Sequence, residues 1–410
     1  MLTYTDKKTP GIRTEDGGIK LFPTLLSVAF VIAAAVFVSL SLLGGTFTDS
    51  AYLQLLISLA MPIAGIALMS MLTASFKMLL PYCIISALII FMGSDVRSSS
   101  AIVVFLMLLA MCAYLLRNRF LILAIFSAVA AFAITFFITQ SFLWAQFSLV
   151  FLPASIVLYL SFEKKMHRVA SVCKISATLG ITLIALFVAW LYVKEGALSF
   201  DIVKGFFDSL RKGVILSITE AVAVAGEQLA LGITLTDASI ASATAVTMLF
   251  NLFPAIFVVT LFIATYVAHS LYISIISPTV EHQEQIANAI TFKMSVSSAI
   301  VFLVAYFGAL ILAYEGLDLY AMAAENLYLI LFPGLSLIAF GFFGSLIRKK
   351  GASCLTSIIY FAIFGLIFFI PNVAFEIAGG VISISAFAGA ILVIVSAIKT
   401  KFQNNSDNTK

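Results

Sequence analysis

Four polar or ionisable side chains could carry chemistry because long apolar stretches surround them: Glu220, Glu227, Asn251 and His269. A carboxylate or an imidazole at bilayer depth is costly unless it faces protein or water, so such residues predict a path for a substrate or an ion. Histidine also titrates near physiological pH, which suits a proton relay. The structural alternative stays open, in which His269 bonds a neighbouring helix and Asn251 only marks a helix entrance.

A second group is basic and lies in the stretch Ser199–Gln228: Lys204, Arg211 and Lys212. Apolar residues recur there at helical spacing, with charges on the opposite face, which predicts an amphipathic helix lying in the membrane interface. We expect the three cations to contact anionic lipid head groups. The segment would either pack the outer rim of the protein or cover a cavity that opens outward.

Signatures of other chemistry are missing from the sequence. No nucleotide-binding loop, zinc-protease motif or nucleophile elbow occurs, so no catalytic residue and no cofactor is predicted. The four cysteines form no CxxC pair, so no metal site is predicted either. Nucleic-acid binding would need a concentrated basic face with stacking aromatics, and none is found.

Composition identifies the surroundings of these residues. Of the 410 residues, 62% are hydrophobic and only 10% are charged, and the mean hydropathy is +1.16. Soluble domains carry about 25% charged residues. Lipid must therefore surround most of the chain, and continuous apolar runs indicate helices rather than a barrel. The predicted fold class is all-α, a polytopic transmembrane helical bundle.

Runs of roughly 20 apolar residues, the length that crosses the hydrocarbon core, predict about twelve spans. They are expected at 21–43, 52–73, 77–93, 100–116, 120–138, 142–161, 173–193, 252–276, 294–314, 327–347, 353–371 and 377–398. The chain then divides into a cytoplasmic tail (1–20), an N-terminal bundle (21–193), an outward segment (194–251), a C-terminal bundle (252–398) and a second cytoplasmic tail (399–410).

The distribution of cations predicts the orientation. Cytoplasmic loops attract Lys and Arg. With both termini in the cytoplasm, all but five of the 23 Lys and Arg residues fall on the cytoplasmic side. An odd number of spans would remove this asymmetry. The stretch Ala313–Asn326, which has acids but no base, is expected to be an outer loop. Residues 199–250 face outward, and 213–253 could be an interfacial helix, a re-entrant hairpin or two extra spans.

The second half of the chain, over 252–398, resembles a known family. The order runs from "LFPAIFVVTLFIATYVAHSLYISI" through "FKMSVSSAIVFLVAYFGALIL" to "NLYLILFPGLSLIAFGFFGSLIRKK" and a final pair of helices. This order resembles the YybS-like family of bacterial polytopic membrane proteins. The resemblance implies a fold similar to the substrate-binding S components of energy-coupling-factor transporters, and it implies no particular substrate.

The leading hypothesis from the sequence is a multi-pass protein of the bacterial cytoplasmic membrane, transporter-like, that handles an organic or lipid-linked solute. One alternative is an envelope polysaccharide ligase or polymerase, in which Arg211 and Lys212 would bind a lipid pyrophosphate. Another is a non-catalytic assembly partner of other membrane proteins. The expected partners are the lipid bilayer, a small-molecule or lipid-linked substrate and a further membrane protein, and no nucleic acid.

Overall fold

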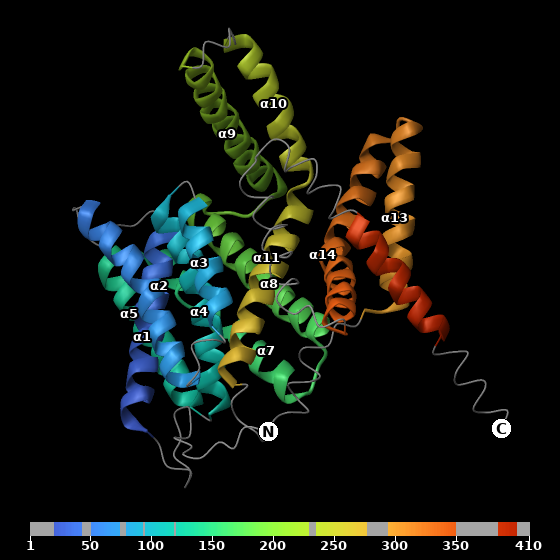
Figure 1. The fold of residues 1–410 in the computed structure, drawn as a ribbon. Coiled ribbons are helices and arrows are strands. Elements are labelled where there is room, and N and C mark those ends of the chain that lie inside the picture. The colour runs from blue at the N-terminus through green and yellow to red at the C-terminus, as the bar shows by residue number, and fades with distance from the viewer. Residues whose placement is uncertain are drawn as a thin grey trace, which may run out of the picture. The chain divides into compact units, whose positions relative to one another are not determined.

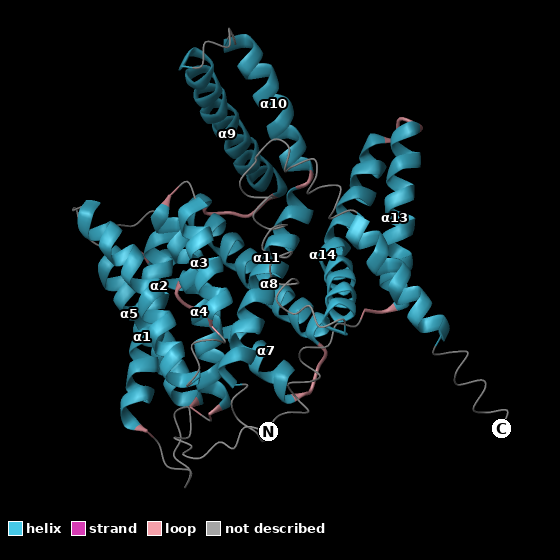
Figure 2. Cartoon of the chain, in the orientation of Figure 1, coloured by secondary structure: helices cyan, strands magenta, loops and turns pink. Residues whose placement is uncertain are grey.

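The structure is a computed structural model that describes residues 20–42, 51–73, 79–92, 95–118, 120–228, 235–276, 294–349 and 384–399. Every regular element within these ranges is an α-helix (Figure 2). The prediction of an all-helical bundle is therefore confirmed for the described part of the chain. Two compact units form, one from Met1–Trp190 with Leu261–Thr291 and the other from Leu191–Thr260 with Phe292–Lys410.

The helices of the first half are α1 (Leu21–Leu42), α2 (Ala51–Thr73), α3 (Leu80–Met92), α4 (Val96–Arg117), α5 (Leu121–Thr139), α6 (Phe142–Phe147), α7 (Phe151–Glu163) and α8 (Arg168–Glu195). Those of the second half are α9 (Phe200–Gln228), α10 (Leu235–Asn251), α11 (Phe253–Ile276), α13 (Val296–Tyr314), α14 (Asp318–Lys349) and a C-terminal helix, Ile384–Lys399.

Nine helical stretches among the described residues are long and apolar enough to cross a membrane. The chain is thus a multi-pass α-helical membrane protein. The stretches that meet the criterion are Leu21–Ser41, Tyr52–Leu72, Val96–Arg117, Leu121–Thr139, Ala145–Glu163, Arg168–Glu195, Phe253–Ile276, Val296–Tyr314 and Asp318–Ala339. The count of twelve stays a prediction, because 353–371 and part of 377–398 lie outside the described residues.

Several expected elements differ in detail. The span expected at 77–93 contains only α3, with 13 helical residues. The span expected at 142–161 is divided into α6 and α7 by a turn at 148–150. The expectation of an outer loop at Ala313–Asn326 is wrong for most of its length, because α14 begins at Asp318. An acidic residue in the first turn favours the helix start there, since it complements the helix dipole.

Helix α4 is the centre of the first unit. It contacts α1, α2, α3, α5 and α7, and 89% of its apolar window is buried, more than in any other candidate span of the described chain (Figure 1). Its N-terminus is fixed by Asp95, whose carboxylate accepts hydrogen bonds from the N–H groups of Arg97 and Ser98. Arg97 then donates from Nη2 to the Leu40 carbonyl at 3.0 Å, which fastens the end of α1 to the start of α4.

The second unit contains two helical assemblies. Helices α9 and α10 lie side by side as an antiparallel hairpin (Figure 1). Helices α13 and α14 form another pair, and the C-terminal helix packs on them through Ala386 and Ala390 against Leu335 and Phe302. Neither α9 nor the 17-residue α10 is among the nine candidate spans of the described chain, and the amphipathic character of the segment stays a prediction.

Candidate functional site

Most buried hydroxyl groups of the described helices are used locally. Ser39, Ser70 and Thr182, for example, each donate to the carbonyl four residues earlier in the same helix. This is the usual way for a hydroxyl to be satisfied where no water is available. Such residues need no ligand. The positions that could bind a ligand are the buried polar groups that lack such a hydrogen bond.

His269 in α11 is the clearest of these positions. Its side chain is only 1% exposed, and neither ring nitrogen has a hydrogen-bond partner among the described residues. Around the start of α8, the Nδ1 atom of His167 and the Oγ atom of Ser171 are also buried without a partner among those residues. Unsatisfied buried polar groups cost free energy, so their concentration at one place indicates bound water, an ion or a ligand.

Arg168 joins the start of α8 to α11 at this place. Its Nη2 donates to the hydroxyl of Ser270, and its guanidinium carbon lies 4.2 Å from the ring centroid of Tyr266. It lies close enough to His269 for its charge to act on the imidazole. We call His167, Arg168, Ser171, Tyr266, His269 and Ser270 the polar cluster. It combines one guanidinium cation, two imidazoles and three hydroxyls, one of them the phenol of Tyr266.

Further contacts show which helix ends meet at the polar cluster. The hydroxyl of Tyr82 in α3 lies 3.3 Å from that of Ser274 in α11. The ring of Tyr272, in the same turns of α11, lies 5.7 Å from that of Phe162 in α7. Arg117, the last residue of α4, lies over the Phe162 ring at 5.6 Å.

The start of α3, the ends of α4, α7 and α11 and the start of α8 therefore share one end of the first unit. Described basic residues outnumber acidic ones around these helix termini. The bases are Arg117, Lys164, Lys165, Arg168 and Lys174, against the single acid Glu163. An excess of positive charge at a membrane-protein end is typical of the cytoplasmic side.

A pair of hydroxyls, which we call the hydroxyl clamp, connects α8 and α11 next to the polar cluster. The hydroxyls of Ser176 and Thr265 lie 2.5 Å apart, and Thr265 also donates to the Leu261 carbonyl at 2.8 Å. Both side chains are buried and fully used. The clamp therefore fixes the crossing of the two helices, and it does not add a further open position to the cluster.

The other residues predicted to line a membrane path lie on α9 and α10. Glu220 is exposed on α9, and Glu227 belongs to the same helix, with its side chain outside the described part. Asn251 ends α10, where its backbone carbonyl accepts a hydrogen bond from Asn326 of α14 at 3.0 Å. Glu220 and Asn251 thus belong to the second unit, whereas the polar cluster belongs to the first.

The three expected lipid contacts lie on α9. Lys204 and Lys212 are exposed, whereas Arg211 is half-buried and donates from Nη2 to the hydroxyl of Thr247 in α10 at 2.6 Å. Arg211 therefore holds the α9–α10 hairpin together. Its use in this contact leaves Lys204 and Lys212 as the exposed cations of the predicted interface surface.

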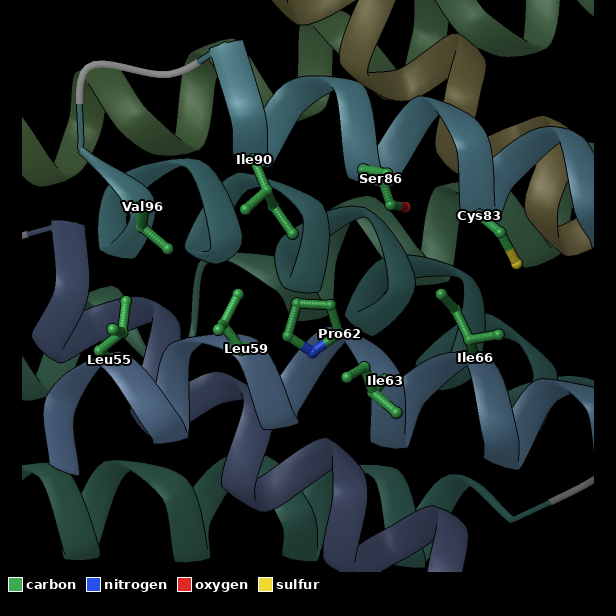
Figure 3. A pocket seen from close by; sticks show the side chains of 10 residues that line it. Leu55, Leu59, Pro62, Ile63, Ile66, Cys83, Ser86, Ile90 and Val96 are labelled. Atoms are coloured by element: carbon green, nitrogen blue, oxygen red, sulfur yellow. The ribbon is translucent and has the colours of Figure 1, made fainter. Parts of the chain in front are cut away.

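An apolar cavity of about 420 Å³ lies between α2 and α3. Leu59, Pro62 and Ile66 of α2 face Cys83 and Ser86 of α3 across it (Figure 3). Among the described residues that line it, only Ser86 and Cys83 carry polar side-chain atoms, so this lining offers space to an apolar chain and little chemistry. The polar cluster remains the better candidate site.

No protein-family model, no curated protein and no solved structure matches this chain. A function can therefore be inferred only from the residues themselves. Sequence reasoning selected His269 because it interrupts an apolar run. It missed Arg168, which looks like one more loop cation in "EKKMHRVAS", because only the fold shows that this residue reaches Ser270 and Tyr266.

Proposed function

We propose that this chain is a transporter-type protein of the bacterial cytoplasmic membrane, with both termini in the cytoplasm, and that the polar cluster is part of its solute or ion path. The observation that supports this proposal is His269, which is buried beside Arg168 with both ring nitrogens unsatisfied among the described residues. Ionisable groups inside membrane helices commonly mark substrate and ion paths.

The charge of the surrounding helix ends favours a particular class of solute. Carboxylate and phosphate oxygens accept hydrogen bonds from guanidinium and imidazole groups, and the described residues at this end are predominantly basic. An organic or lipid-linked solute that carries such a group would accept a hydrogen bond from the ring N–H of His269. The proposal also includes membership of the YybS-like family, which the order of proline, glycine and basic residues over 252–398 supports.

The polysaccharide ligase alternative would use Arg211 to hold a pyrophosphate. The hydrogen bond from Arg211 to Thr247 gives this cation a structural use and makes that alternative the weaker one. The third alternative is that this chain is a non-catalytic assembly partner of other membrane proteins. No contact among the described residues specifically favours it.

A thermal-stability screen in lipid nanodiscs tests the proposal. The probes are inorganic phosphate, acetate and tetramethylammonium at matched ionic strength. We expect phosphate or acetate, and not tetramethylammonium, to raise the unfolding temperature of the wild-type protein. Arg168→Gln and His269→Gln should lose at least tenfold in apparent affinity for the stabilising anion.

Lys174→Gln is the matched control, because it removes a positive charge from an exposed position on the same helix. If Lys174→Gln weakens the anion effect as much as Arg168→Gln, the effect is general electrostatics and the proposed path is wrong. Stabilisation by tetramethylammonium alone would also contradict the proposal.

A further inference from the structure

The connection between α10 and α11 contains an unusual hydrogen-bond arrangement. In an uninterrupted helix, the N–H of Ala255 would donate to the carbonyl of Asn251, four residues earlier. Here Ala255 donates instead to Oδ1 of Asn326 in α14, at 3.0 Å. The Nδ2 group of Asn326 donates to the Asn251 carbonyl, also at 3.0 Å. One side-chain amide therefore stands between the two backbone groups that would otherwise bond each other.

The surrounding residues limit the break to a short segment. Pro254 has no N–H, so the preceding helical hydrogen bond, to the Phe250 carbonyl, cannot form in any conformation. The helical pattern resumes when Ile256 donates to Leu252 at 2.9 Å. Asn326 is held in place by a third hydrogen bond, from Nδ2 to the Met322 carbonyl of its own helix at 3.0 Å. Inserted side chains are a recognised cause of sharp helix kinks.

We propose that the α10–α11 joint exchanges between two forms. In the broken form the Asn326 amide is inserted between Ala255 and Asn251, and in the unbroken form the N–H of Ala255 donates directly to the Asn251 carbonyl. The backbone groups of Ala255 and Asn251 have partners in both forms. Asn326 is half-buried and its bond to Asn251 is exposed, so water can satisfy the withdrawn amide. The unbroken form keeps a milder kink at Pro254.

The two forms differ by about one net hydrogen bond, so both are populated to within about tenfold of each other. Exchange changes the angle between α10 and α11. Because Arg211 bonds Thr247 across the hairpin, α9 and α10 move together about Leu252. The joint belongs to the second unit, and this inference is independent of the path proposed for the polar cluster.

A spin-label distance measurement on the full chain in nanodiscs tests the exchange. Genetically encoded labels at Thr244 and Thr260, both exposed, leave the native cysteines in place. Thr260 follows Thr244 by 16 positions, which corresponds to about 24 Å in an uninterrupted helix. We expect two distances in the wild-type protein, the longer one approaching this value.

Asn326→Leu should enrich the longer distance about fivefold, because the broken form loses both bridging bonds. Asn326→Asp, which keeps the acceptor for Ala255 but removes the donor to Asn251, should act in the same direction and more weakly. It also provides a test if Asn326→Leu does not fold. Asn118→Ala is the control, since the Asn118 side chain makes the corresponding bond to the carbonyl four residues earlier, away from the α10–α11 joint. A single distance in the wild-type protein, or a ratio unchanged in both Asn326 variants, would overturn the proposal.

Discussion

Gly389 in the C-terminal helix permits a close approach to α14, and replacing it with alanine tests how much that approach contributes to stability. A Cβ atom at Gly389 would lie 2.7 Å from the carbonyl carbon of Leu335 in α14 and closer still to the carbonyl oxygen. These are backbone atoms, which cannot move aside as a side chain can. Carbon atoms prefer separations of 3.5–4.0 Å, so the helices must move apart by about 1 Å.

This displacement would loosen the small-residue contact in which Ala386 and Ala390 pack against Leu335 and Phe302. Packing of this kind is a main source of helix association in lipid, where the hydrophobic effect between helices is absent. Overpacking a close contact lowers the free energy of unfolding by about 1–3 kcal/mol. Alanine also improves helix propensity by up to about 1 kcal/mol, which partly hides the loss.

Gly308→Ala in α13 is the matched control, because a Cβ at Gly308 meets no atom within 4 Å. Both variants gain the same propensity, so the difference between them isolates the packing contribution. We expect Gly389→Ala to unfold more easily than Gly308→Ala by about 1–3 kcal/mol. Unfolding with increasing sodium dodecyl sulfate in mixed micelles, followed by circular dichroism, measures the difference. Equal stabilities would refute the close-packing argument.

Two further predictions concern helix ends. Lys165, after α7, has φ 52°; its N–H donates to the Phe162 carbonyl, and that of Met166 donates to the Ser161 carbonyl, a helix-end motif that favours glycine. Lys165→Gly should therefore raise the free energy of unfolding by about 0.5–1 kcal/mol. A decrease in the same micelle assay would contradict this. At the N-terminus of α4, hydrogen bonds from the hydroxyl and the N–H of Ser98 lower the pKa of Asp95. A carboxyl whose pKa is lowered by folding stabilises the protein above its unfolded pKa, about 3.9, and this contribution is lost as the pH falls through the folded pKa. The stability advantage of the wild type over Asp95→Asn should therefore decrease as the pH falls below about 3.9. An advantage independent of pH would exclude the carboxylate as its cause.

The sequence predicted the helices best where an apolar run is bounded by polar residues. The expected spans 21–43, 52–73 and 252–276 correspond to α1, α2 and α11 within two residues at each end. Prediction failed where packing decides the ends. The turn at 148–150 that separates α6 from α7 is as apolar as its neighbours, since it contains Leu149 and Val150, so hydropathy could not show it.

Polar residues were harder to interpret from the sequence because their partners are distant along the chain. His269 was visible as an isolated imidazole in an apolar helix. Asn326 was not selected, because an asparagine beside an acidic stretch resembles a loop residue. Its role depends on Ala255 and Asn251, which are 71 and 75 residues away. The orientation of the termini and the lipid contacts of Lys204 and Lys212 stay predictions.

The central position of α4 has a consequence for biosynthesis. Helices α1, α2 and α3 precede it in the chain, but α5 and α7, which also contact it, follow it. While the chain is still emerging from the ribosome, α4 must therefore remain in lipid with one side uncovered until Glu163 has been synthesised. We expect truncated chains that end before α7 to be recognised by membrane quality-control proteases, and chains that extend past α7 to be spared.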